Sequence, residues 1–396
     1  MSKSSFAPFR DFLERESSSG ILLLSAAALG LLVANSPVAE IYYRALDLSF
    51  SLATIGIDLE MTILKVINYG LMTIFFFVVG LEIKRELTSG HLSELKKATA
   101  PLFAALGGMA LPALIYLAIA GRTAPEGWAI PVATDIALAV GILALMGTRA
   151  TDGLKSFLLA LAVIDDIGAI IIIAFVFSAG AIFSWLVAAL AAIGAVLVLQ
   201  RLGVMKSYIY ALVGVLLWYS LYKAGVHPTL AGVIMGLLTP ATTVVDPRYQ
   251  DTEDGTLTIV EKLQGNFHGF SAFIVVPVFA FANAGVKLSL EALEAAINSP
   301  IAWGIVAGLA IGKPLGIFLI AKGAQASKLA ELPIGTTNSS LFAVGGVAGI
   351  GFTVAIFIAK LAFTEPGLQD LAVTAVMAGS LISGLLGVAL FRLKRY

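Results

Sequence analysis

The sequence predicts an all-α polytopic membrane protein, and three observations support this fold class. Hydrophobic residues make up 59% of the 396 residues and charged residues only 13%, whereas soluble domains carry roughly 25% charged residues. The mean hydropathy is +0.96. Apolar runs of about 20 residues, the length that a helix needs to cross a bilayer, recur along the chain. We expect twelve spans, near 20–35, 62–82, 101–120, 128–147, 156–178, 182–200, 207–222, 226–239, 266–286, 301–321, 341–359 and 370–391.

The composition argues against several partners and cofactors. A formal net charge of +0 gives no basis for binding nucleic acid. The chain has no cysteine, so disulfides, thiolate metal sites and cysteine nucleophiles are absent. The histidines, His91, His227 and His268, are too far apart in sequence to form a metal-ligand motif. We therefore expect no cofactor.

Residues 1–19 are expected to form a cytoplasmic amphipathic segment, because Phe6, Phe9 and Leu13 recur at helical spacing among acidic residues. The apolar run 20–35 that follows resembles the core of a signal peptide, but its acidic flank favours a retained first span. With the N-terminus inside, most Lys and Arg residues fall in cytoplasmic segments. Both termini are therefore predicted to be cytoplasmic.

Two loops stand out within the single transmembrane domain predicted for 1–396. The external segment 46–59, "LDLSFSLATIGIDL", alternates apolar and polar residues around a glycine, which is typical of a β-hairpin. Such a hairpin is marginal alone, so it could pair with a second subunit or lie on its own chain. The cytoplasmic loop 240–264 is the longest and is acidic, as solvated surfaces often are.

Four ionisable residues lie deep in predicted spans: Asp135, Asp165, Asp166 and Lys313. One interpretation is that they form buried ion pairs between helices. Three acids face one base, however, so two carboxylates remain after one pair forms. A carboxylate in a medium of low dielectric constant takes up a proton or holds a cation. The excess of acids therefore favours transport over a purely structural role.

The adjacent acids of "LAVIDDIGAI" have separate roles by geometry. Successive helical residues point about 100° apart, so Asp165 and Asp166 cannot face the same partner. One can meet a neighbouring helix while the other faces a cavity. The two residues are therefore predicted to have different partners.

Backbone signals in two spans predict helix interruptions near these acids. Pro131 removes a helical hydrogen bond four residues before Asp135, and "AVGGVAGIGFT" in the eleventh span is rich in glycine. Glycine also permits close helix packing, which is the alternative interpretation. Spans 3–5 and 10–12 would form inverted repeats, each with an interrupted, crossing helix (spans 4 and 11) in the middle.

The predicted site offers hard oxygen ligands: carboxylates, the Thr134 hydroxyl and carbonyls released by the breaks. Such ligands suit a small alkali cation and equally protons. "AGLAIGKPLG" lacks the spacing of an ATP-binding P-loop, so ion gradients are the expected energy source. Carboxylates that hold either protons or a cation, exposed alternately to each side, would couple the two flows as an antiporter.

Seven stretches in order resemble the bacterial NhaA-type sodium/proton antiporters almost from end to end. They are "FFFVVGLEIKREL" (75–87), "EGWAIPVATDIALAVG" (126–141), "ALAVIDDIGAIIII" (160–173), "AGVHPTLAGVIMG" (224–236), "FAFANAGV" (279–286), "IGKPLGI" (311–317) and "GIGFTVAIFIA" (349–359).

The resemblance implies roles for the buried residues. Asp166 would be the principal carrier of sodium and protons, and Asp165 would contribute to the Na⁺ site and be the partner of Lys313. Asp135 and Thr134 would lie where the interrupted helices cross and offset their dipole ends. Activity would be electrogenic exchange of Na⁺ or Li⁺ for H⁺ across the bacterial inner membrane, by a homodimer joined through 46–59 in the lipid bilayer.

The resemblance also implies activation at alkaline pH through Glu82, Arg85 and Glu86 at the cytoplasmic mouth. The segment "EKLQGNFHGFSAF" departs from the family pattern, since only His268 remains of its histidine-and-tryptophan motif, and the activation pH is therefore open. Two alternatives are an intramembrane aspartyl protease, which also needs two buried acids but whose GxGD motif is missing, and a passive cation channel.

Overall fold

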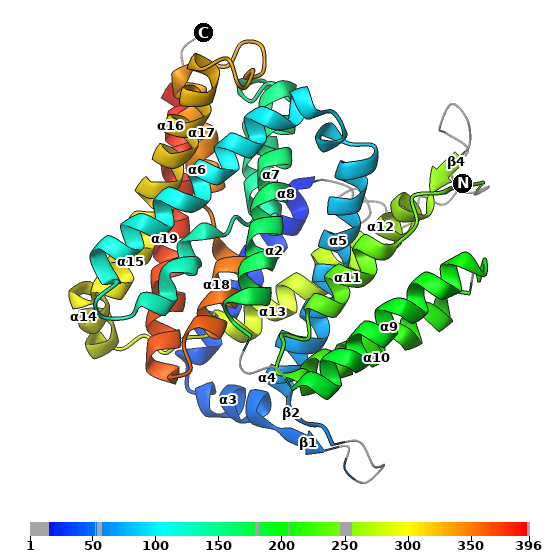
Figure 1. Ribbon diagram of the computed structural model, residues 1–396. Helices are drawn as coiled ribbons and strands as arrows, with labels where there is room; N and C mark the ends of the chain where they lie inside the picture. The colour runs from blue at the N-terminus through cyan, green and yellow to red at the C-terminus, as the bar shows by residue number, and fades with distance from the viewer. Residues whose placement is uncertain are drawn as a thin grey trace, which may run out of the picture. The chain divides into compact units, whose positions relative to one another are not determined.

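The computed structural model describes residues 16–51, 53, 58–178, 182–204, 206–245 and 256–393, and most of this chain is helical (Figure 1). Most of the predicted amphipathic segment 1–19 lies outside the described residues. Eight described helices are long and apolar enough to cross a membrane, or ten if each of two bent helix pairs is one span. The prediction of an all-α polytopic membrane fold is confirmed.

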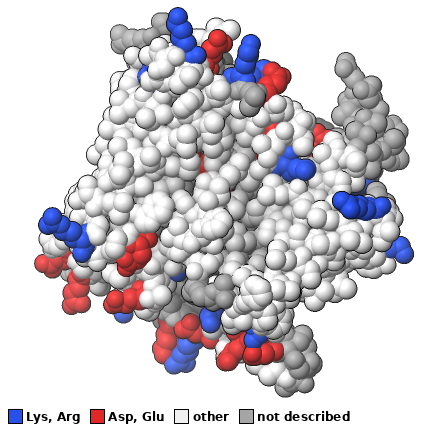
Figure 2. All heavy atoms as spheres, viewed as in Figure 1, with Lys and Arg blue, Asp and Glu red and all other residues white. Residues whose placement is uncertain are grey.

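Two of the twelve predicted spans fall outside those ten. They correspond to α10 (Ser207–Ala224) and α11 (Leu230–Leu238), which are helices at the predicted places. α11 is short, as expected for the eighth span. Exposed leucines on other helices, such as Leu190 and Leu385, point to a lipid-facing surface. The face drawn in Figure 2 is mostly uncharged, with Lys, Arg, Asp and Glu mainly near its margins.

The chain divides into two compact units. Unit 1 comprises 1–45, 94–169 and 280–396, and unit 2 comprises 46–93 and 170–279. The elements of unit 1, in whole or in part, are α2 (Glu16–Ala34), α3 (Ala39–Asp47), α6 (Leu95–Ala120), η4 (Pro125–Val132), α7 (Ile136–Leu145), η5 (Gly147–Arg149), α8 (Asp152–Phe175), α13 (Val276–Asn283), α14 (Leu290–Asn298), α15 (Pro300–Ala307), η7 (Gly308–Gly312), α16 (Lys313–Ala326), α17 (Asn338–Ala348), α18 (Phe352–Ala362) and α19 (Pro366–Leu393).

Unit 1 contains two helical triplets in the order that the sequence predicts. In the first, α6 and α8 flank the interrupted span η4–α7. In the second, the continuous helix α15–η7–α16 and α19 flank the interrupted span α17–α18. α16 packs along α6, and α17 packs along α19 (Figure 1). Each triplet thus has a broken middle member, as expected for repeats that cross at a site.

The first and second triplets meet at glycines. A Cβ atom added to Gly316 of α16 would lie 2.1 Å from the Gly107 carbonyl oxygen of α6, so the two backbones are in contact. Small residues allow this approach in membranes, where packing rather than water drives helix association. The close crossing keeps the helix that carries Lys313 against α6.

Unit 2 is mostly helical and contains two short pairs of strands. Its elements, in whole or in part, are β1 (Ser49–Ser51), β2 (Glu60–Thr62), α4 (Ile63–Lys65), η2 (Val66–Leu71), α5 (Met72–Thr88), η3 (His91–Ser93), α9 (Phe183–Arg201), α10, α11, β3 (Thr243–Val245), β4 (Thr256–Thr258), α12 (Ile259–Phe270) and η6 (Ser271–Val275), with the remaining parts of α3, α8 and α13. α5 packs against α11 and α12, and α9 packs against α10.

Both two-stranded sheets among the described residues belong to unit 2. β1 and β2 pair antiparallel with Phe50 opposite Met61, which confirms a hairpin near 46–59. The second strand begins at Glu60, one residue beyond the predicted boundary. The pairing of β3 with β4, in the loop 240–264, was not predicted.

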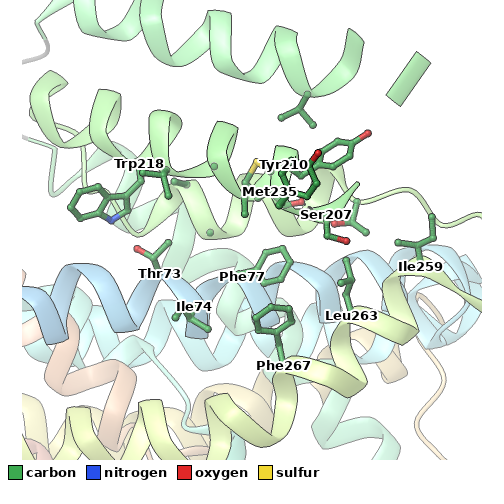
Figure 3. Close-up of a pocket in the computed structure, with 18 of the residues that line it drawn as sticks. Thr73, Ile74, Phe77, Ser207, Tyr210, Trp218, Met235, Ile259, Leu263 and Phe267 are labelled. Atoms are coloured by element: carbon green, nitrogen blue, oxygen red, sulfur yellow. Dashed lines mark hydrogen bonds between the residues drawn. The ribbon is translucent and has the colours of Figure 1, made fainter. Parts of the chain in front are cut away.

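Unit 2 also holds a cavity of about 850 Å³ between α5, α9, α10, α11 and α12. Phe77 and Phe267 approach each other edge to face within it, with ring centroids 5.5 Å apart, while Trp218 and Met235 line other parts of its wall (Figure 3). None of the four buried ionisable residues lines this cavity. The candidate ion site therefore lies elsewhere, within unit 1.

Candidate ion-binding site at the crossing of two interrupted helices

The first interruption lies in the predicted fourth span. η4 is a 3₁₀ segment that ends at Val132, and α7 begins only at Ile136. Pro131, near the end of η4, cannot donate the hydrogen bond that a continuous α-helix would need. Asp135 then caps α7, because its Oδ1 atom accepts a hydrogen bond from the Leu138 amide at 3.1 Å.

The second interruption lies in the predicted eleventh span. α17 ends at Ala348, α18 begins at Phe352, and the two helices are bent by 50°. The break coincides with the glycine-rich stretch that predicted it. Crowding shows why glycine is needed: a Cβ atom on Gly349 would lie 2.4 Å from the Leu309 carbonyl oxygen.

The two interruptions cross and are bonded to each other. The Asp135 amide donates to the Ile350 carbonyl at 2.6 Å, and the amide and hydroxyl of Thr353 donate to Asp135 Oδ2 at 3.0 and 2.6 Å. The Thr134 hydroxyl lies 2.9 Å from the Ala348 carbonyl oxygen. Asp135 thus stands at the N-termini of both α7 and α18, where a negative charge is favoured by the helix dipoles.

Asp165 and Lys313 form a buried ion pair beside this crossing. Lys313 Nζ lies 3.0 Å from Asp165 Oδ2, and neither side chain is exposed. Lys313 Nζ also donates to the Val132 carbonyl, at the end of η4. The Thr134 hydroxyl lies 2.7 Å from Asp165 Oδ2, so its single hydrogen can serve either Asp165 or Ala348. One ammonium group therefore joins α8, α16 and the first interruption.

Asp166 follows Asp165 on α8 and is 5% exposed. Its charge also acts on Lys313, although the ion pair is made by Asp165. The Oδ1 atom of Asp165 is buried without a hydrogen-bond partner in the part of the chain that the structure describes. The ion pair with Lys313 is thus made by the first of the two adjacent acids.

No group of three or more His, Cys, Asp or Glu side chains lies close enough to hold a metal ion, within the described ranges. A cation at Asp165 and Asp166 would therefore complete its coordination with hydroxyl, carbonyl or water oxygens. Thr134 and the carbonyls at the two breaks are oxygens of this kind. This ligand set fits a hard monovalent cation better than a transition metal.

The residues expected to regulate activity belong to unit 2, whereas the ion-site residues belong to unit 1. Glu82, Arg85 and Glu86 share the end of α5, where Arg85 Nη2 lies 3.6 Å from Glu86 Oε1. His268 is exposed on α12, close enough to Arg85 for the arginine charge to act on it. The structure thus brings this predicted group of charges together.

Sequence reasoning missed Thr353, which makes two of the bonds to Asp135. The available signal was a hydroxyl residue directly after the glycine-rich break, because the first amides of a helix have no intrahelical partner and bond to groups at the break. It also missed two serines of α19, Ser380 and Ser383, whose hydroxyls reach the same region.

Comparison with known proteins shows the family of this chain. The family described as Na⁺/H⁺ antiporter 1 matches residues 10–391. The chain belongs to this antiporter family. Among its relatives, the Na⁺/H⁺ antiporter NhaA of Yersinia pseudotuberculosis serotype O:1b is 45% identical over 388 residues, covering 97% of this chain and 96% of the relative.

Two Shewanella relatives match over similar lengths. Na⁺/H⁺ antiporter NhaA 2 of S. denitrificans is 43% identical over 94% of this chain and 92% of its own length. NhaA of S. frigidimarina is 44% identical over 96% of this chain and 94% of its own length. The resemblance to NhaA-type antiporters that the motifs indicated is therefore confirmed, and it extends over nearly the whole chain.

Proposed function

We propose that this protein is a secondary antiporter that exports Na⁺ or Li⁺ in exchange for H⁺. The observation that carries the proposal is the buried pair of Asp165 and Lys313, with Asp166 next to it, at the crossing of two interrupted helices. Full-length relatives named as Na⁺/H⁺ antiporters support the same activity.

Competition for the carboxylates provides the coupling. Lys313 balances one negative charge at Asp165, so an ionised Asp166 adds a further charge that a buried site holds only with a counter-ion. A proton or a monovalent cation can supply the positive counter-charge, but binding of one to the carboxylate weakens binding of the other. Exposure of the site to one side and then to the other exchanges the two ions.

The unpartnered Oδ1 atom of Asp165 gives the cation a second carboxylate oxygen, and the Thr134 hydroxyl can turn between Asp165 and Ala348 as the site fills. Asp166 can release one proton, and the ion pair of Asp165 with Lys313 can release a second when the cation takes the place of the ammonium group at Asp165. This count supports electrogenic exchange, in which more protons than sodium ions move in each cycle.

The proposal includes the location, assembly and regulation of the protein. It would lie in the bacterial inner membrane as a multi-pass protein with cytoplasmic termini, and it would form a homodimer through the β1–β2 hairpin. Glu82, Arg85, Glu86 and His268 would set the pH of activation. The clustering of their charges at one end of α5 and α12 supports this role.

The protease alternative has little support from the geometry. Asp135 is held by Thr353 and by helix amides, and Asp165 by Lys313 and Thr134. Neither carboxyl group is arranged to activate a water molecule against a peptide. A passive channel differs from an exchanger because it moves sodium without moving protons in return.

The test is Na⁺-driven proton movement in proteoliposomes that contain a pH-sensitive dye. Asp166→Asn should abolish exchange, because a side-chain amide neither takes up a proton nor carries the negative charge that attracts Na⁺. Asp152→Asn is the matched control, since Asp152 lies on the same helix with a fully exposed side chain and should keep the parental rate. Full exchange in Asp166→Asn would refute the assignment. Sodium flux without proton movement in the parent would favour a channel.

A further inference from the structure

Two buried serines of α19, Ser380 and Ser383, are bonded to the backbone on which the ion site is built. Ser383 is 0% exposed and Ser380 is 5% exposed. Ser383 Oγ lies 2.8 Å from the Gly346 carbonyl oxygen of α17 and 3.2 Å from the Leu309 carbonyl oxygen of η7. Ser380 Oγ accepts a hydrogen bond from the Phe352 amide of α18 at 3.2 Å. α19 therefore contacts both halves of the interrupted span.

The last carbonyls of α17 need partners, because a helix that stops leaves them without intrahelical donors. The Gly349 amide bonds to Gly345, and the Ile350 amide bonds to Val347. The other two lie next to side-chain hydroxyls that each have a second acceptor: Ser383 is near Gly346 and Leu309, and Thr134 is near Ala348 and Asp165. Ser383 and Thr134 thus complete the same helix end.

The first amides of α18 are divided in the same way. Phe352 donates to Ser380, and the next residue, Thr353, donates to Asp135. A side-chain oxygen from α19 and one from the first interruption therefore cap adjacent positions of one helix. Ser380 and Ser383 thus bond to the backbone at this break from α19, and Thr134 and Asp135 bond to it from the first interruption.

Ser383 also acts on the helix that carries Lys313. In a regular α-helix the Lys313 amide would bond to the carbonyl of Leu309, four residues earlier. In η7 it bonds instead to Gly308, five residues earlier, which leaves the Leu309 carbonyl for another donor. The Ser383 hydroxyl lies within reach of it, and its single hydrogen can serve either Leu309 or Gly346. The hydroxyl thus lies between the π-helical turn before Lys313 and the end of α17.

We propose that Ser383 and Ser380 are positioning residues of the ion site, which hold the interrupted span and the Lys313 turn in the register that cation binding requires. The inference rests on the proposed exchange function. The junction has little spare room, because a Cβ atom on Gly349 would lie 2.1 Å from Ser383 Oγ. A water molecule therefore cannot readily replace the lost hydroxyl, and the backbone itself must shift.

The test compares Ser383→Ala and Ser380→Ala with Thr374→Val. Thr374 lies on the same helix, but its hydroxyl bonds to the Asp370 carbonyl of its own helix. Loss of one hydrogen bond changes an equilibrium by about 3- to 10-fold. We expect the Na⁺ concentration for half-maximal exchange to rise by about that factor in both serine variants, with a smaller change in maximal rate. Thr374→Val should match the parent.

Hydrogen–deuterium exchange provides a readout that needs no transport. Amides in 346–356 should exchange faster in both serine variants and at the parental rate in Thr374→Val. If Ser383→Ala does not fold, the proposal is judged on Ser380→Ala, which loses only the acceptor for the Phe352 amide. Parental half-saturation and parental amide exchange in the folded variants would overturn the proposal. Failure of the proposed function would instead appear as exchange retained in Asp166→Asn.

Discussion

At the scale of single residues, the ion pair between Asp165 and Lys313 is the contact on which the site depends most. Both side chains are fully buried, so water does not screen either charge. Removing one member of such a pair is far more damaging than replacing both, because the remaining charge stays in a medium of low dielectric constant.

Lys313→Ala should therefore lower the free energy of unfolding by about 3–5 kcal/mol. Adding Asp165→Asn should recover part of that loss, since it removes the stranded charge. Thermal unfolding in detergent micelles measures both effects. Lys322→Ala is the control on the same helix, because Lys322 bonds only to the exposed side chain of Gln325, and it should change stability by less than about 0.5 kcal/mol. A Lys313→Ala protein as stable as the parent would show that the pair contributes nothing.

The sequence allowed the charged members of the site and the Thr134 hydroxyl to be predicted, but not the hydroxyls of Thr353, Ser380 and Ser383. An acid or a lysine inside an apolar run has no ordinary explanation, so Asp135, Asp165 and Lys313 are conspicuous. A serine or threonine in the same place usually bonds to a carbonyl of its own helix, as Ser220 and Thr374 do here. Only the structure separates those from hydroxyls that reach another helix.

At the scale of elements, glycine and proline mark where helices break and where they touch. The breaks before α7 and α18 were predictable because Pro131 and the glycines near 349 weaken a continuous helix. The π-helical turns η2, η6 and η7 were not, because residues 66–71 and 271–275 read as ordinary apolar helix. At η7, the Leu309 carbonyl that the π-helical turn leaves over lies near the Ser383 hydroxyl of α19.

Gly316→Ala should destabilise the protein, because the new methyl group would lie 2.1 Å from the Gly107 carbonyl oxygen and must force α16 away from α6. We expect a loss of about 1–3 kcal/mol, typical of overpacking. Gly323→Ala is a matched control on α16: nothing lies within 4 Å of its new Cβ, and alanine favours a helix by about 1 kcal/mol. Thermal midpoints should move down for the first variant and slightly up for the second. Equal shifts would argue against close packing at this crossing.

At the scale of the whole molecule, composition was enough to predict an all-α membrane protein, and motif order was enough to predict its family. Local pattern could not give the division into two compact units, since each unit draws on distant segments of the chain. It also placed the second strand of the hairpin too early. The alternation near 46–59 ends before the second strand, which begins at Glu60. In the paired strands, Phe50 lies opposite Met61.

The hairpin is the element through which we expect two copies to associate. All three residues of β1 are exposed, including Phe50 at 43%. Among the residues that the structure describes, β1 pairs only with β2, and a two-stranded sheet with free edges readily accepts another strand. Near the hairpin, Lys223 forms an ion pair with Asp58, which joins the β1–β2 segment to α10 within the same chain.

Phe50→Glu should therefore lower the dimer fraction, because it places a charge in the contact and removes an apolar side chain from it. Sedimentation velocity in detergent measures this fraction over a range of protein concentrations. Ile334→Glu is the control, since Ile334 is fully exposed in unit 1 and lies outside the hairpin, and it should leave the dimer unchanged. A dimer that withstands Phe50→Glu, with the chain folded and active, would mean that the copies meet through another surface.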